Sequence, residues 1–97
     1  MMGKERVQQR SLSKLREEID ATDRELFSLI AQRMAIVREI GALKQAQGNA
    51  IADPVREALL KSKLKEFSAG VLEPWHVEEL ASVLITISRD LQARSGE

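Results

Sequence analysis

The chain has 97 residues, enough for one small domain, and 31% of them are charged. Fifteen basic residues balance 15 acidic ones, so no strong net charge draws the chain to nucleic acid or to an anionic membrane. Aromatic residues make up 3% and cysteine is absent, which excludes disulfides and thiol nucleophiles and argues against base-stacking surfaces. With one histidine, His76, a zinc site of Cys and His within one chain is also excluded.

The two ends of the chain are polar. Residues 1–10 lack the apolar core of a secretory signal, and we expect them to form a flexible N-terminal segment of a cytoplasmic protein. Residues 94–97 are expected to be a polar tail. Residues 11–93 then form a single helical domain.

One long helix is predicted from Ser11 to Gln47, a stretch without proline. Ser11 or Ser13 is the expected N-cap, and the Gly-Asn pair at 48–49 is expected to end the helix. Charged residues occur throughout and exclude a membrane span. Apolar residues recur at intervals of three, four and seven, as on one face of an α-helix. They are Leu12, Leu15, Ile19, Leu26, Ile30, Val37 and Ile40.

The length of this helix implies a partner chain. At 1.5 Å per residue it would be about 50–55 Å long, whereas a domain of this size is about 30–35 Å across. The helix therefore cannot be buried within its own monomer. We expect a partner to lie along the exposed part of its apolar face.

Two shorter helices are predicted to follow. Asp-Pro at 53–54 opens the first, with aspartate as N-cap and proline in the first turn, and residues 68–70 close it. Glu-Pro at 73–74 begins the second. No strand is predicted, so the fold class is all-α, with one very long, one short and one medium helix. The expected buried face of the last helix consists of Val77, Leu80, Leu84, Ile87 and Leu91.

Two cations, Arg33 and Lys44, lie within the apolar face of the long helix. They are about three turns apart and point within about 20° of each other. Both side chains could extend from the edge of a helix interface with their charges in water. Alternatively they bind an anionic ligand, because buried cations need partners.

Further polar residues lie near predicted core positions. Arg56 and Glu57 fall at the start of the second helix, while Ser88 and Gln92 are four apart on the third. Each alone fits a solvated first turn or a hydroxyl or amide bonded to backbone. Together with the two cations of the long helix they suit a small molecule bearing carboxylates and a hydroxyl. No nucleophile, acid pair, phosphate loop or metal motif accompanies them, so an enzyme would act by orientation and electrostatic stabilisation.

Several runs of the sequence resemble the all-helical class of chorismate mutases. Their order and spacing cover about residues 12–92. The resemblance implies that the chain converts chorismate to prephenate in phenylalanine and tyrosine biosynthesis, without a cofactor or a metal. It also implies an intertwined helical homodimer whose sites combine residues of both chains. The runs are LREEID (15–20), AQR (31–33), GALK (41–44), IADPVRE (51–57) and SRDLQ (88–92).

The resemblance implies roles for single residues of the long helix. Arg16 matches an arginine donated to the partner's site, and Arg33 matches a same-chain arginine that binds a substrate carboxylate. Lys44, with Gln92 of the last helix, matches the pair that contacts the ether oxygen of the breaking bond. Geometry agrees with the role of Arg16, which lies about 25 Å from Arg33 along a straight helix and points about 100° away. One small dianion cannot touch both arginines in the same chain.

The remaining matched residues lie on the second and third helices. Asp53 and Glu57 match residues near the ring hydroxyl, Asp53 through its backbone. Arg56 and Ser88 match the other polar positions around the substrate carboxylates.

Two alternatives stay open, and a third is disfavoured. Isochorismate–pyruvate lyase uses a similar scaffold, although that enzyme lacks the Arg-Glu pair found here at 56–57. A catalytically silent module could bind a ligand or dock on another enzyme of the aromatic pathway. A plain coiled-coil scaffold would not need cations within its interface.

Overall fold

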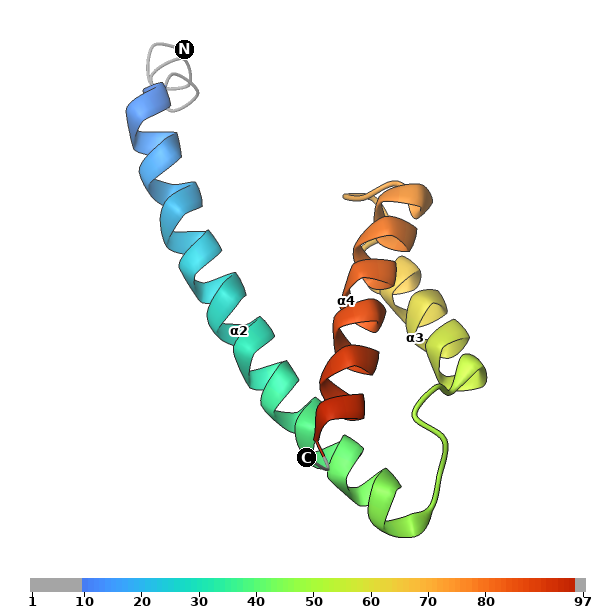
Figure 1. Cartoon of the computed structure of the whole chain (residues 1–97). Helices are drawn as coiled ribbons and strands as arrows, with labels where there is room; N and C mark the ends of the chain where they lie inside the picture. Colours follow the sequence, from blue (N-terminus) through green and yellow to red (C-terminus); the bar gives the residue numbers. More distant parts are fainter. Residues whose placement is uncertain (1–9, 96–97) are drawn as a thin grey trace. The chain divides into compact units, whose positions relative to one another are not determined.

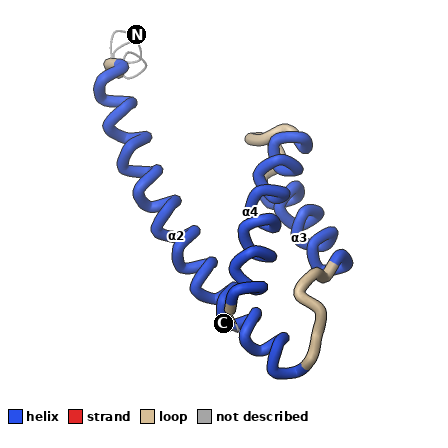
Figure 2. Tube along the Cα trace, in the orientation of Figure 1, coloured by secondary structure: helices blue, strands red, loops and turns tan. Residues whose placement is uncertain are grey.

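The computed structural model describes residues 10–95, and this part of the chain is helical with connecting loops (Figure 1). Its helices are α2 (Leu12–Gln47), α3 (Pro54–Phe67) and α4 (Pro74–Arg94). No strand occurs within residues 10–95 (Figure 2). The predicted all-α class with three helices is confirmed. Residues 1–9 of the predicted flexible segment and residues 96–97 of the predicted tail lie outside the described residues, and Arg94 is the last residue of α4.

The ends of α2 follow from local hydrogen bonds. Ser11 is its cap, since the Ser11 Oγ accepts from the backbone N–H of Lys14 at 3.0 Å. At the other end Gly48 has a φ of 72°, a left-handed conformation that glycine adopts without a steric penalty. The N–H of Asn49 donates to the carbonyl of Lys44 at 2.8 Å, closing a Schellman turn. No helix in the described part of the chain is long and apolar enough to cross a membrane.

The starts of α3 and α4 also use the predicted residues. Asp53 accepts a hydrogen bond from the backbone N–H of Arg56 at 3.1 Å, and proline follows it at the first helical position. Before α4, the backbone N–H of Glu73 donates to Nδ1 of His76 at 3.0 Å. The single histidine therefore helps to form a helix start.

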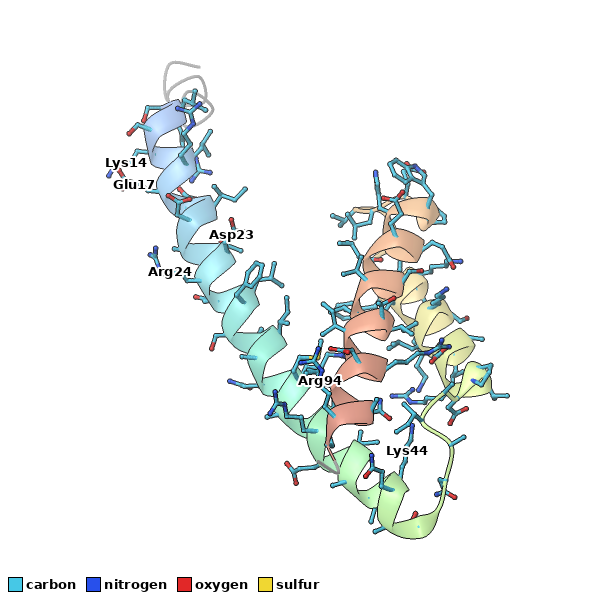
Figure 3. All side chains as sticks on the ribbon, viewed as in Figure 1. Lys14, Glu17, Asp23, Arg24, Lys44 and Arg94 are labelled. Carbon is cyan, nitrogen blue, oxygen red and sulfur yellow. The ribbon has the colours of Figure 1, made fainter. Side chains whose placement is uncertain are left out.

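Two units are distinguished along the described chain, residues 10–33 and residues 34–95, with their boundary inside α2. In the first unit α2 exposes most of its side chains, charged and apolar alike. Figure 3 shows Lys14, Glu17, Asp23 and Arg24 projecting from this part of the helix. Most of the predicted apolar residues are exposed here too, and Leu12 exposes 61% of its surface, while Ile30 is half-buried.

The second unit contains α3 and α4 side by side, together with the end of α2 (Figure 1). Ion pairs link α3 to α4, because Glu78 accepts from Lys61 at 2.7 Å and from Lys65 at 3.0 Å. The buried apolar core is small and consists of Val37, Val77 and Ala81.

The single chain buries only part of the face that was predicted to be buried on the last helix. Leu80 and Ile87 are exposed. In the single chain the buried face includes small Ala81 and differs from the predicted one. Two polar residues expected at the edge of the core therefore lie within the buried face. Its buried members are Val77, Ala81, Ser88 and Gln92.

Candidate active site

Lys44 and Gln92 form the centre of the candidate site. The Lys44 ammonium donates to Gln92 Oε1 at 2.8 Å and to the carbonyl of Ile51 at 2.8 Å. Three segments thus meet at one side chain: α2, the loop before α3, and α4. Figure 3 labels Lys44 near this loop. Lys44 is half-buried and Gln92 exposes only 8% of its surface.

The direction of this hydrogen bond determines what the pair can do chemically. Because Gln92 Oε1 accepts from Lys44, the other end of the amide carries N–H donors. The ammonium has three donors, and the two bonds given above engage two of them among the described residues. Both side chains can therefore donate to one electron-rich oxygen.

Gly41 allows this approach of α2 to α4. It is buried, and a Cβ at this position would lie 2.7 Å from the Cα of Gln92 and 2.9 Å from its carbonyl oxygen. Only glycine fits so close to another helix backbone. Lys44 is three residues further along α2, on the same face, which places its ammonium next to the Gln92 amide.

Ser88 lies four residues before Gln92 on the buried face of α4. Its hydroxyl donates to the carbonyl of Leu84 at 2.7 Å and lies 4.0 Å from the sulfur of Met34. Met34 thus contributes an apolar wall from α2.

Glu57 is held by a residue that the sequence analysis missed. Arg89 of α4 donates through Nε to one carboxylate oxygen of Glu57 at 2.8 Å, and through NH2 to the other oxygen at 2.5 Å. Hydrogen bonds from Arg89 are the main cause that lowers the pKa of Glu57, against partial desolvation, and Glu57 in turn raises the pKa of Arg89. The sequence signal was weak, because an exposed arginine can pair with many carboxylates.

The other predicted residues are more exposed. Asp53 uses its carboxylate as the cap of α3 and its carbonyl to accept from the N–H of Glu57 at 3.0 Å. Arg56 is exposed at the helix start. Arg16 and Arg33 belong to the unit of residues 10–33, where Arg16 is exposed and Arg33 half-buried. The structure therefore joins Lys44 directly to Gln92. The two hydrogen bonds of the Lys44 ammonium, to Gln92 and to the carbonyl of Ile51, do not involve either arginine.

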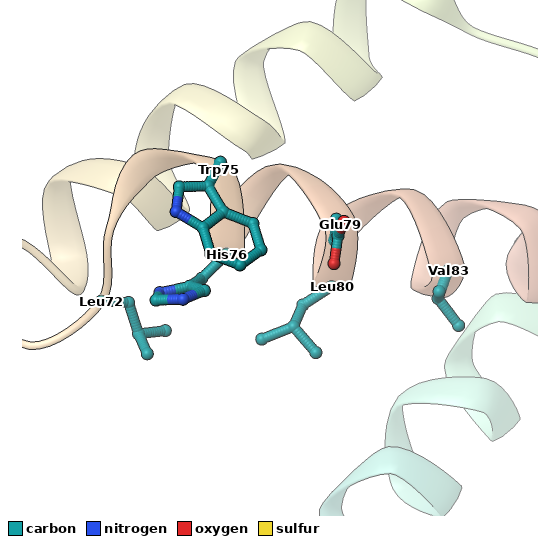
Figure 4. A pocket seen from close by; sticks show the side chains of 6 residues that line it. All are labelled: Leu72, Trp75, His76, Glu79, Leu80 and Val83. Atoms are coloured by element: carbon teal, nitrogen blue, oxygen red, sulfur yellow. The ribbon is translucent and has the colours of Figure 1, made fainter.

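A separate apolar hollow lies beside the first turns of α4 (Figure 4). None of the predicted site residues lines it, and no lysine or arginine does, so it does not suit an anionic substrate. Within residues 10–95, no group of three metal-binding side chains is placed to hold a metal ion. The hollow is lined by Leu72, Trp75, His76, Glu79, Leu80 and Val83.

Comparison with known proteins gives one matching family and several relatives. The family model described as chorismate mutase type II matches residues 15–93. A T-protein of Enterobacter agglomerans is 39% identical over 70 residues, covering 71% of this chain and 19% of the relative. A T-protein of Haemophilus influenzae is 41% identical over 63 residues, covering 63% and 17%. A chorismate mutase of Methanocaldococcus jannaschii is 29% identical over 55 residues, covering 57% and 56%. The chain thus spans about a fifth of the length of the two T-proteins.

Proposed function

Because the chain belongs to the chorismate mutase type II family, we propose that it is an isomerase that rearranges chorismate to prephenate. The observation that carries the proposal is the Lys44–Gln92 hydrogen bond of 2.8 Å, which places two donors where helices α2 and α4 meet. The rearrangement is pericyclic and needs no acid, base, nucleophile or metal. Donors that orient the substrate and stabilise developing charge are sufficient for it.

Orientation is the first task of the site. The substrate must adopt its compact conformer, with the enolpyruvyl carbon against the ring. Arginines fixing its two carboxylates would hold it there. We assign this role to Arg33 of the same chain and to Arg16 of the second copy, with Arg56 and Ser88 as further polar contacts. Glu57 and the backbone of Asp53 would contact the ring hydroxyl.

Electrostatic stabilisation is the second task. As the C–O bond lengthens, negative charge grows on the ether oxygen, and Lys44 and Gln92 would stabilise this charge more than the ground state. Such differential stabilisation raises kcat rather than lowering KM. The Gln92 amide does not titrate, so it remains a hydrogen-bond donor at neutral pH. A carboxyl group in its place would have to stay protonated to donate. We therefore expect activity at neutral pH.

We also propose that the active form is an intertwined homodimer built from residues 11–93. Large apolar side chains of α2 support this proposal, since Leu12, Ile19 and Phe27 expose 61%, 57% and 67% of their surface in the single chain. Burying such a face against a second copy would be favourable. The same arrangement would let Arg16 serve the site of the second copy. Such a dimer would be a cytoplasmic enzyme of aromatic amino acid biosynthesis.

Incubation of the purified protein with chorismate and, separately, with isochorismate tests the proposal, with products followed by chromatography. Formation of prephenate from chorismate is the expected result. Pyruvate and salicylate from isochorismate alone would assign the chain to the lyase reaction instead. A folded protein that converts neither compound would refute an enzymatic role and favour a binding module.

A further inference from the structure

We infer that Arg89 is a positioning residue, which holds the Glu57 carboxylate as an ionised hydrogen-bond acceptor for the ring hydroxyl of the substrate. The inference rests on the proposed function and adds a residue to it. Arg89 lies beside Ser88 and three residues before Gln92, so one stretch of α4 carries all three. Arg89 of this stretch also holds the carboxylate of Glu57 at the start of α3 through two hydrogen bonds.

The geometry of the ion pair fixes Glu57 at two points. Arg89 uses Nε and NH2 on different oxygens of the same carboxylate, the forked arrangement that only arginine provides. An ionised carboxylate has about four lone-pair sites, so two remain after Arg89 has bound. The carboxylate can therefore accept a hydroxyl hydrogen without losing its partner.

The charge and hydrogen bonds of Arg89 support an ionised Glu57 against the effect of burial. Its side chain is 21% exposed while that of Arg89 is 47% exposed, so the carboxylate is the more enclosed member of the pair. Hydrogen bonds from Arg89 lower the pKa of Glu57, whereas desolvation and the neighbouring charge of Asp53 raise it. Arg89 is the charged partner on the facing helix and the largest cause that lowers this pKa; without it, only the backbone hydrogen bond at Asp53 would oppose desolvation and the Asp53 charge.

A double-mutant cycle separates this role from simple helix packing. The variants are Arg89→Met, Glu57→Gln and the double variant, assayed for kcat/KM with chorismate. Each single change is expected to lower kcat/KM by about tenfold. The kcat/KM of the double variant is expected to be no lower than that of the less active single variant, because both changes remove the same coupled contact. Arg89→Lys keeps the charge without the fork and should recover part of the loss.

The dependence of kcat/KM on pH is a second test of the role of Arg89. Removing Arg89 should raise the pKa of Glu57 and move the acid limb of kcat/KM to higher pH. When Arg89→Met is added to the Glu57→Gln variant, this shift should be absent. Lys65→Met is the matched control, because it breaks another α3–α4 ion pair about two helical turns from Glu57. This control should leave both kcat/KM and its pH profile unchanged.

The outcomes distinguish this inference from the proposed function. No turnover of chorismate by the wild-type protein would overturn both. An active wild-type enzyme whose Arg89→Met and Glu57→Gln effects multiply, with an unmoved acid limb, would overturn only the role of Arg89. That role would also be overturned if Lys65→Met lowered kcat/KM as much as Arg89→Met did.

Discussion

Lys44 Nζ lies 2.8 Å from Gln92 Oε1, although the two residues are 48 positions apart in the sequence. The contact joins α2 to α4 and is accompanied by a second bond from Lys44 to the carbonyl of Ile51. It depends on helix backbones that approach closely at Gly41. One cation and one amide are thereby placed side by side, where both can donate to an anionic oxygen.

Gly41→Ala should lower both stability and activity. The added Cβ would lie under 3.0 Å from backbone atoms of Gln92, which cannot move aside as a flexible side chain can. The gain in helix propensity is at most about 1 kcal/mol, and overpacking costs about 1–3 kcal/mol, so the clash should prevail. We expect a lower urea midpoint and a reduced kcat, because α4 must shift away from Lys44.

Gly48→Ala is the matched comparison for this substitution. Its Cβ would meet no atom within 4 Å, but its φ of 72° is unfavourable for alanine and should cost about 1–2 kcal/mol. We expect a loss of stability with an almost unchanged kcat. Equal losses of kcat in the two variants would contradict a specific role for the Gly41–Gln92 contact.

Acid should destabilise the fold partly through Glu57 and Glu78. Arg89 lowers the pKa of Glu57. Hydrogen bonds from two lysines lower the pKa of Glu78, that of Lys61 more than that of Lys65. A carboxyl whose pKa is lower in the folded state stabilises the fold above its unfolded pKa of about 4.3. This contribution is lost as the pH falls through the folded pKa. Urea midpoints at a fixed protein concentration should therefore decline between about pH 5 and pH 3.

The double variant Glu57→Gln, Glu78→Gln tests the assignment of that decline. It should be less stable than wild type at pH 7 and should lose less stability on acidification. An identical acid-induced loss in both proteins would show that other carboxylates are responsible.

Subunit complementation tests whether Arg16 acts in the partner's site. Arg16→Ala and Lys44→Ala should each be nearly inactive alone. In a mixed dimer one site would contain intact Lys44 of one chain and intact Arg16 of the other, and the second site would lack both. Refolding the variants together at equal amounts should therefore restore about a quarter of wild-type activity. No recovery, in dimers shown to be mixed, would refute the exchange of Arg16.

The helices and their ends could be predicted from the sequence, because local residues determine them. Ser11, Gly48 and Asp53 act through hydrogen bonds or backbone angles within a few positions. The resemblance also singled out Lys44 and Gln92, which the structure joins. Neither residue's periodic position alone could show that they touch.

Other features depended on packing that the sequence pattern does not contain. Ala81 and Gln92 are buried in α4 while Leu80 is exposed in the single chain, an order that the spacing of apolar residues alone does not give. The pairing of Glu57 with Arg89 is equally hidden. It links residues 32 positions apart, and nothing local distinguishes Arg89 from other exposed arginines.

The central claim is that Lys44, held against Gln92, stabilises the ether oxygen as chorismate becomes prephenate. The most direct test is the steady-state kcat of Lys44→Ala with chorismate, measured on a dimer whose mass and helicity match those of wild type. Losing such a donor typically costs about 3–4 kcal/mol of barrier, so kcat should fall at least about a hundredfold. A kcat close to that of wild type would contradict the claim.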